Sequence, residues 1–165
     1  MEDPNKVERS FDFYLKKALI KKEKELIFLP ASHLKKAEYN INFVNLLINS
    51  KKFYDWIIVG CYYAIYHSAL ALITKKGFSS KNHLSTLCAL IKFYYSQDEI
   101  LNKDEIELVS NSSLQKEEVS YFVYAKEKRE TASYGISEEF NKSEAEDIYK
   151  KTIQFLNKCR EILEN

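Results

Sequence analysis

The stretch from Trp56 to Ile73 constrains the fold more than any other, because none of its side chains carries a formal charge. At this length, such a stretch is able to cross a membrane as one helix. It also contains Tyr, His and Ser side chains, whose polar atoms a lipid-facing helix would leave unsatisfied. The central helix of a bundle, apolar nearly all round, accommodates them better. We therefore expect a soluble protein with no membrane span and with this segment at its centre.

Helix breakers are scarce throughout the chain. Its 165 residues contain 3 Gly and 2 Pro, which favours long helices over a many-turned β fold. No segment alternates with a period of two well enough to predict a strand. The length suits one domain with a sizeable core. These features predict an all-α fold, an antiparallel up-and-down bundle of about five to six helices.

Apolar residues at spacings of three and four predict where the helices lie. Pro30 is expected to end the first helix, and Gly77 the third. Ser79-Ser80 is expected to cap the fourth helix, and capping boxes mark two later starts. The first four helices are expected over residues 6–28, 32–48, 53–75 and 80–94. A fifth helix is expected to begin at Asn102, with Glu105 completing its capping box, to weaken at 110–113 and to resume as far as 134. The last helix is expected to begin at Ser143, with Glu146 in its capping box.

Composition and spacing exclude several classes of site. The formal net charge of +1 does not indicate a bulk electrostatic hold on nucleic acid, although a local basic patch stays open. The three cysteines are far apart, which predicts buried thiols in a reducing cytoplasm and no disulfide framework. The histidines show no metal-ligand spacing, and nucleotide-binding or hydrolase motifs are absent. We expect no metal and no cofactor.

Three segments occur in an order that resembles the HEPN family, and closely its small stand-alone archaeal and bacterial members. They are Tyr62-Tyr63-Ala64-Ile65-Tyr66-His67, then Ser80-Lys81-Asn82-His83, then Lys128-Arg129-Glu130-Thr131-Ala132-Ser133-Tyr134. The resemblance runs from about residue 31 to the end of the chain. It therefore predicts an N-terminal helical extension over residues 1–30 and a HEPN-like bundle over residues 31–165.

The resemblance implies an antiparallel helical bundle that commonly dimerises. Many HEPN proteins are metal-independent RNases, whereas others are inactive and bind nucleotides or partner proteins. Active members carry an Arg followed shortly by a His, and the resemblance places Arg129 at the Arg position. No His follows Arg129 here, because His33, His67 and His83 all lie upstream.

Metal-free RNA cleavage requires a base, an acid and a cation at the phosphoryl oxygens. The guanidinium of Arg129 suits the phosphate charge, and Glu130 would position it. Tyr134 would orient the substrate or donate a proton. His67 or His83 would serve as the proton-transfer group, because imidazole titrates near neutral pH.

Each of these residues also has a structural interpretation. Arg129 and Glu130 fit an ion pair near a helix end, and Tyr134 fits a packing residue. His67 fits a hydrogen-bonded core histidine, whereas His83 and His33 fit cap or surface positions. The three tyrosines of the central helix fit core positions with satisfied hydroxyls, or else a ligand-binding face that stacks on a base: Tyr62, Tyr63 and Tyr66.

Three functional hypotheses follow. The chain is a metal-independent RNA endonuclease, in one version the toxin of a pair whose antitoxin is a nucleotidyltransferase. Alternatively, it is a catalytically inactive HEPN module that binds nucleotide, RNA or a nucleotidyltransferase. The third hypothesis is a helical interaction protein without a ligand site. In the first two cases we expect a cytoplasmic homodimer.

Overall fold

The computed structural model describes residues 4–23, 28–50, 52–111 and 142–164. Helices dominate this part of the chain, which confirms the predicted all-α bundle, and one two-stranded sheet accompanies them. The elements are α1 (Pro4–Lys16), β1 (Ile20–Lys22), α2 (Leu29–Ser50), α3 (Tyr54–Lys75), β2 (Phe78–Ser80), α4 (His83–Leu90), the π-helix η1 (Ile91–Gln97) and α6 (Lys142–Glu164). Residues 103–111 are also helical.

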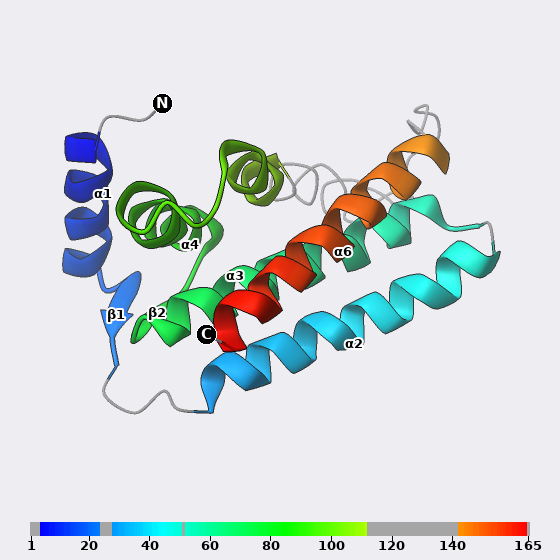
Figure 1. Cartoon of the computed structure of the whole chain (residues 1–165), viewed down its shortest axis with the longest axis horizontal. Coiled ribbons are helices and arrows are strands. Elements are labelled where there is room, and N and C mark those ends of the chain that lie inside the picture. The colour runs from blue at the N-terminus through cyan, green and yellow to red at the C-terminus, as the bar shows by residue number, and fades with distance from the viewer. Residues whose placement is uncertain (1–3, 24–27, 51, 112–141, 165) are drawn as a thin grey trace, which may run out of the picture.

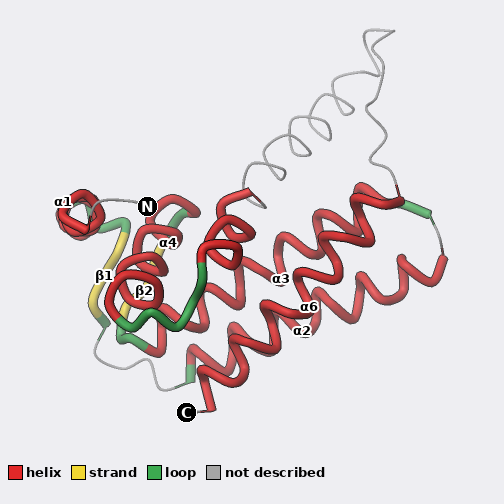
Figure 2. Tube along the Cα trace, turned by 45° about the horizontal axis from the view of Figure 1, so that its top comes forward, coloured by secondary structure: helices red, strands yellow, loops and turns green. Residues whose placement is uncertain are grey.

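The three long helices α2, α3 and α6 lie side by side, and α1 stands at one end of this layer (Figures 1 and 2). The central helix α3 contacts both α2 and α6. It is long and apolar enough to cross a membrane, but 78% of its most apolar window is buried inside the protein. This is the burial expected of the core helix of a soluble bundle.

Gly60 allows α2 and α3 to approach each other closely. A Cβ atom at this position would lie 2.4 Å from the Cγ2 atom of Val44 on α2. Val44 is fully buried and, as a β-branched residue in a helix, has little rotamer freedom. The glycine therefore sets the spacing of the two helices that carry His33 and His67.

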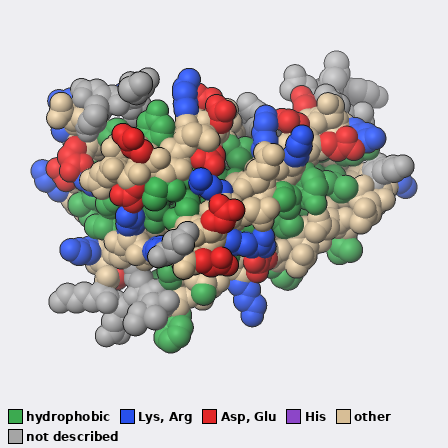
Figure 3. Space-filling view, viewed as in Figure 1, with side chains coloured by type: hydrophobic (Ala, Val, Ile, Leu, Met, Phe, Trp, Pro, Cys, Tyr) green, Lys and Arg blue, Asp and Glu red, His purple; other side chains and the backbone are tan. Residues whose placement is uncertain are grey.

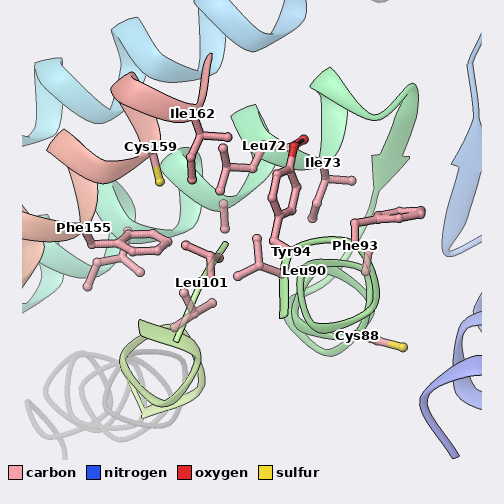
Figure 4. Close-up of a cluster of buried hydrophobic side chains, with 14 of the residues drawn as sticks. Leu72, Ile73, Cys88, Leu90, Phe93, Tyr94, Leu101, Phe155, Cys159 and Ile162 are labelled. Atoms are coloured by element: carbon pink, nitrogen blue, oxygen red, sulfur yellow. Dashed lines mark hydrogen bonds between the residues drawn. The ribbon is translucent and has the colours of Figure 1, made fainter. Parts of the chain in front are cut away.

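The main hydrophobic core lies between α3, the α4–η1 segment and α6 (Figure 4). Tyr94 crosses this core and donates a hydrogen bond from its hydroxyl to the carbonyl oxygen of Leu72, at 2.8 Å. All three cysteines are buried thiols, as predicted. Burial raises the pKa of Cys61 to about 12, so this thiol is not a nucleophile at neutral pH.

The first predicted helix is wrong in its second half. It ends at Lys16, well before Phe28, and Ala18 has a positive φ of 52°. The chain then forms β1, which pairs antiparallel with β2 in the register Ile20 to Ser80. The expectation of no strands was therefore also wrong. These strands have three residues each, too few for an alternating pattern, and their pairing partner is distant in sequence.

Three helix starts also differ from prediction. The helix α2 begins at Leu29, so Pro30 lies in its first turn, where its missing N–H costs nothing. The N-cap of α4 is Asn82, whose Oδ1 atom accepts the N–H of Ser85 at 2.9 Å. Ser80 is not the cap because it belongs to β2. At the other end of the chain, Ser143 lies within α6 and not before it.

Two other predictions about helix ends are confirmed. Gly77 follows the end of α3 with φ of +80°, a left-handed conformation that favours glycine. Asn102 and Glu105 form the predicted reciprocal capping box, each side chain accepting the other residue's backbone N–H.

Candidate functional site

All three histidines of the chain meet in one group of aromatic rings, which we call the ring cluster. Four of its members lie on α3, one at the start of α4 and one near the start of α2. The members are Tyr62, Tyr63, Tyr66 and His67, then His83, then His33. Each ring lies within about 6 Å of another, centroid to centroid.

The first half of the ring cluster joins α3 to α4. The buried hydroxyl of Tyr62 lies 2.9 Å from Nδ1 of His83, and it also contacts Nε2 of the same ring. Tyr66 stacks parallel to Tyr62, and its ring centroid lies 4.3 Å from that of His83. Because a tyrosine hydroxyl donates or accepts, it can accompany a change in the protonation of the imidazole.

The second half joins α3 to α2. Nδ1 of His33 lies 3.2 Å from Nδ1 of His67, so one ring donates while the other accepts. Burial, together with the smaller electrostatic effects of His33 and Lys36, lowers the pKa of His67 to about 4. Burial also lowers the pKa of His33. Both imidazoles are therefore neutral at neutral pH.

Helical spacing explains how the single helix α3 contributes rings to both halves of the ring cluster. Tyr62 and Tyr66 are one turn apart and form a row toward His83, whereas Tyr63 and His67 form the adjacent row. Tyr62 is buried and Tyr66 half-buried, as expected of core tyrosines, but Tyr63 is 37% exposed. Tyr63 therefore has the most exposed ring of the three tyrosines.

His33 was predicted to be a surface or cap residue, and its pairing with His67 was missed. The two histidines lie at equal distances along the chain from the α2–α3 turn near Ser50. In an antiparallel helix pair this symmetry places them opposite each other, so the signal was present.

The remaining predicted site residues lie outside the described part of the chain. These are Arg129, Glu130 and Tyr134, and their roles stay predictions. Among the described residues, no group of three or more His, Cys, Asp or Glu side chains could hold a metal ion.

The described part of the chain also contains a hollow with an acidic lining. A cavity of about 700 Å³ lies between residues 102–111 and α6. Its lining includes five carboxylates, which repel phosphate: Asp104, Glu105, Glu107, Glu144 and Asp147. On the face drawn in Figure 3, acidic and basic side chains are interspersed, without a large patch of one sign. A nucleic-acid ligand therefore has no reason to prefer this face.

The fold and the ring cluster define a class of small all-α protein whose central helix presents tyrosine and histidine rings to its neighbours. A model of the HEPN domain family matches residues 31–162, so the chain belongs to this family. It is also similar to the protein named "Putative toxin MJ0142" of Methanocaldococcus jannaschii. The two are 29% identical over 130 residues, which cover 79% of this chain and 78% of the relative. The resemblance found in the sequence is thereby confirmed.

Proposed function

We propose that the protein is a metal-independent RNA endonuclease of the HEPN type and the toxin of a toxin–antitoxin pair. One observation carries the proposal: the imidazole of His83 lies against the hydroxyl of Tyr62 and the ring of Tyr66. An imidazole in contact with a tyrosine hydroxyl is able to move a proton, which metal-free cleavage requires. The similarity to a protein named as a toxin supports the same conclusion.

In the proposed reaction, a base removes the proton of the RNA 2′-OH and the resulting oxygen attacks the adjacent phosphorus. The bond to the 5′ oxygen breaks, that oxygen takes up a proton, and a 2′,3′-cyclic phosphate remains. His83 is the proton-transfer group, and its contact with the Tyr62 hydroxyl orients the imidazole. Arg129 stabilises the phosphoryl charge, Glu130 positions it, and Tyr134 donates a hydrogen bond or a proton.

His67 is the weaker of the two histidine candidates. Its pKa of about 4 makes it a poor base at neutral pH, because proton affinity and catalytic strength fall together. Its hydrogen bond with His33 also occupies one ring nitrogen. We assign the pair of His33 and His67 to holding α2 against α3.

Exposed rings supply a binding surface and an interface. We propose that Tyr63 stacks on an RNA base, which every base permits through its π face. We further propose a homodimer through the outer face of α2. Tyr39, Phe43 and Leu46 are exposed there at spacings of four and three residues, so they share one side of the helix. The antitoxin of the pair would be a nucleotidyltransferase.

The test is cleavage of mixed single-stranded and transfer RNA in the presence of a chelator. Wild type should leave 2′,3′-cyclic phosphate ends, and Arg129→Ala should abolish them. The matched control is Arg160→Ala, which removes an arginine that pairs with Glu38 on the bundle surface. Cleavage that survives Arg129→Ala, or that requires added metal, would contradict the proposal.

One observation supports a second candidate function, a catalytically inactive module that binds RNA or nucleotide. No histidine follows Arg129 in the sequence, unlike in active HEPN proteins. This alternative predicts no cleavage but saturable RNA binding, measured by fluorescence anisotropy with labelled RNA. Tyr63→Ala should then weaken binding by about tenfold, because stacking on one base contributes ~1–3 kcal/mol.

A further inference from the structure

The segment before the family match is attached to the strand that leads into His83. We call residues 4–23 the N-terminal arm; it comprises α1 and β1 and precedes the residues that the family model matches. The N–H of Lys81 donates to the carbonyl of Leu19, and the N–H of Glu23 donates to that of Gly77, both at 3.0 Å. These bonds flank the paired strands β1 and β2.

The arm is also anchored in the main core. Phe11 of α1 is 3% exposed and packs edge-on against Phe78 of β2 and Phe93 of η1, with centroids 5.5 and 5.3 Å apart. Ile20 of β1 belongs to the same buried cluster. Burying these two large apolar side chains stabilises the docked arm. The arm is therefore a fixed part of the fold.

A short path of hydrogen bonds leads from the arm to the site. The Ser85 hydroxyl lies 3.4 Å from the carbonyl oxygen of Leu19, 2.6 Å from the Ser80 hydroxyl and 3.0 Å from the carbonyl oxygen of Asn82. Ser85 is fully buried. Asn82 caps α4, and the next residue is His83, whose ring meets Tyr62.

We propose that the N-terminal arm is a positioning element for His83, which fixes the start of α4 through β2 and so holds the imidazole on the Tyr62 hydroxyl. Only Lys81 and Asn82 separate β2 from His83, so a displacement of the strand moves the ring. A misplacement of about 1 Å costs a catalytic group up to ~100-fold in rate. The functional part of this inference rests on the proposed RNase activity, whereas the placement of the ring does not.

Two proline substitutions test whether the pairing of β1 with β2, and not only the presence of the N-terminal arm, positions His83. Hydrogen-bonded pairs alternate along antiparallel strands, and Leu19–Lys81 and Glu23–Gly77 are such pairs. Lys21 faces Ser79 between them, so its N–H bonds to β2, whereas the N–H of Lys22 points away. Lys21→Pro therefore removes a bond between the strands, and Lys22→Pro is the matched control, since both lysines are exposed.

The first readout is the NMR signal of the His83 imidazole and its pH titration, which needs no activity. Lys21→Pro should shift both, and Lys22→Pro should leave them at their wild-type values. The second readout is RNA cleavage, where Lys21→Pro should lower kcat by about 10- to 100-fold at unchanged KM. A shifted His83 signal in a protein that never cleaves RNA supports the arm's role and refutes the RNase.

A milder pair of variants covers the case in which Lys21→Pro does not fold. Ser85→Ala removes the hydroxyl that reaches Leu19, and the control Ser50→Ala removes one that bonds to the carbonyl oxygen of Leu47 within α2, at 2.6 Å. Ser85→Ala alone should shift the His83 signal. The proposal is overturned if Ser85→Ala leaves the His83 signal and titration unchanged. It is also overturned if Lys21→Pro opens β1, as hydrogen exchange would show, without changing that signal.

Discussion

The two histidine contacts of the ring cluster differ in what holds them and in what they can do. His33 and His67 face each other across two long helices, share one hydrogen bond and are neutral at neutral pH. His83 meets a tyrosine hydroxyl at the first residue of a short helix, next to a strand that the N-terminal arm holds. Under the proposed function, the same residue type serves packing in one contact and proton transfer in the other.

The difference teaches that burial alone does not identify a catalytic histidine. His67 has the strongly shifted pKa, yet the direction of that shift removes its ability to accept a proton at neutral pH. The partner of His83 is the Tyr62 hydroxyl, which is able either to donate or to accept a hydrogen bond. The hydrogen-bond partner of each imidazole, and the element that holds that imidazole in place, therefore distinguish the two contacts better than the burial of the ring does.

The largest expected effect is on RNA cleavage and tests the comparison directly. His83→Asn should reduce the single-turnover rate by about 100-fold or more, because general acid–base groups contribute ~10²- to 10⁴-fold. His67→Asn should reduce it by less than about tenfold, since it alters only packing near the site. Equal losses, or a larger loss in His67→Asn, would reverse the roles assigned here.

The second effect is on stability, and it tests the His33–His67 contact separately from the His83 contact by disturbing only the packing of α2 against α3. Gly60→Ala should lower the free energy of unfolding by about 1–3 kcal/mol, because its Cβ would overlap Val44 and outweigh the better helix propensity of alanine. Chemical denaturation measures the loss. By separating α2 from α3, the substitution should also raise the pKa of His67 and leave the His83 signal unchanged.

A suppressor provides the control for Gly60→Ala. Val44→Ala removes the methyl group that the new Cβ would meet, so the double variant should lose less stability than the sum of the two single variants. Additive losses would show that Val44 does not set the helix spacing. The His33–His67 contact would then depend on other packing.

Sequence alone predicted the helices best where the signal is local and repeated. The range of α3 and the capping box at Asn102 and Glu105 follow from side-chain spacing within a few residues. The β1–β2 pairing was missed because it joins segments more than fifty residues apart, and three residues are too few for a pattern. Propensity without tertiary contacts continued the first helix to Phe28, although the chain turns at Ala18.

In the ring cluster, too, the sequence predicted the local spacing of residues but not the contacts between distant segments. The sequence put Tyr62, Tyr63, Tyr66 and His67 on one helix and named His83 as a candidate, but it could not show which rings meet. The contact between Tyr62 and His83 depends on how α4 leaves β2, which a helical spacing does not encode. The roles of Arg129, Glu130 and Tyr134 still rest on the family resemblance.

The pH dependence of the free energy of unfolding should identify the contribution of the His33–His67 contact, because the pKa of His67 is lowered and not raised. The folded-state pKa of His67, about 4, lies below the ordinary value of 6.5. The unfolded chain thus takes up this proton first as pH falls. Stability from this group is therefore fully present above pH ~6.5 and is lost progressively down to about 4. Urea unfolding between pH ~7 and ~4 should show a smaller loss in His67→Gln than in wild type. An identical pH dependence would mean that His67 titrates normally.

The smallest effect concerns an ion pair that joins α6 to α2. Nε and Nη2 of Arg160 donate to Oε1 of Glu38 at 3.1 and 2.9 Å, but both side chains are about 40% exposed. Glu38→Gln should therefore lower the free energy of unfolding by only ~0.2–1 kcal/mol. Neither the His67 titration nor the His83 signal should move, because packing at Gly60 places α2. If Glu38→Gln did raise the pKa of His67, the ion pair would be what holds α2 in position, and the two histidine contacts would then differ by electrostatics and not by packing.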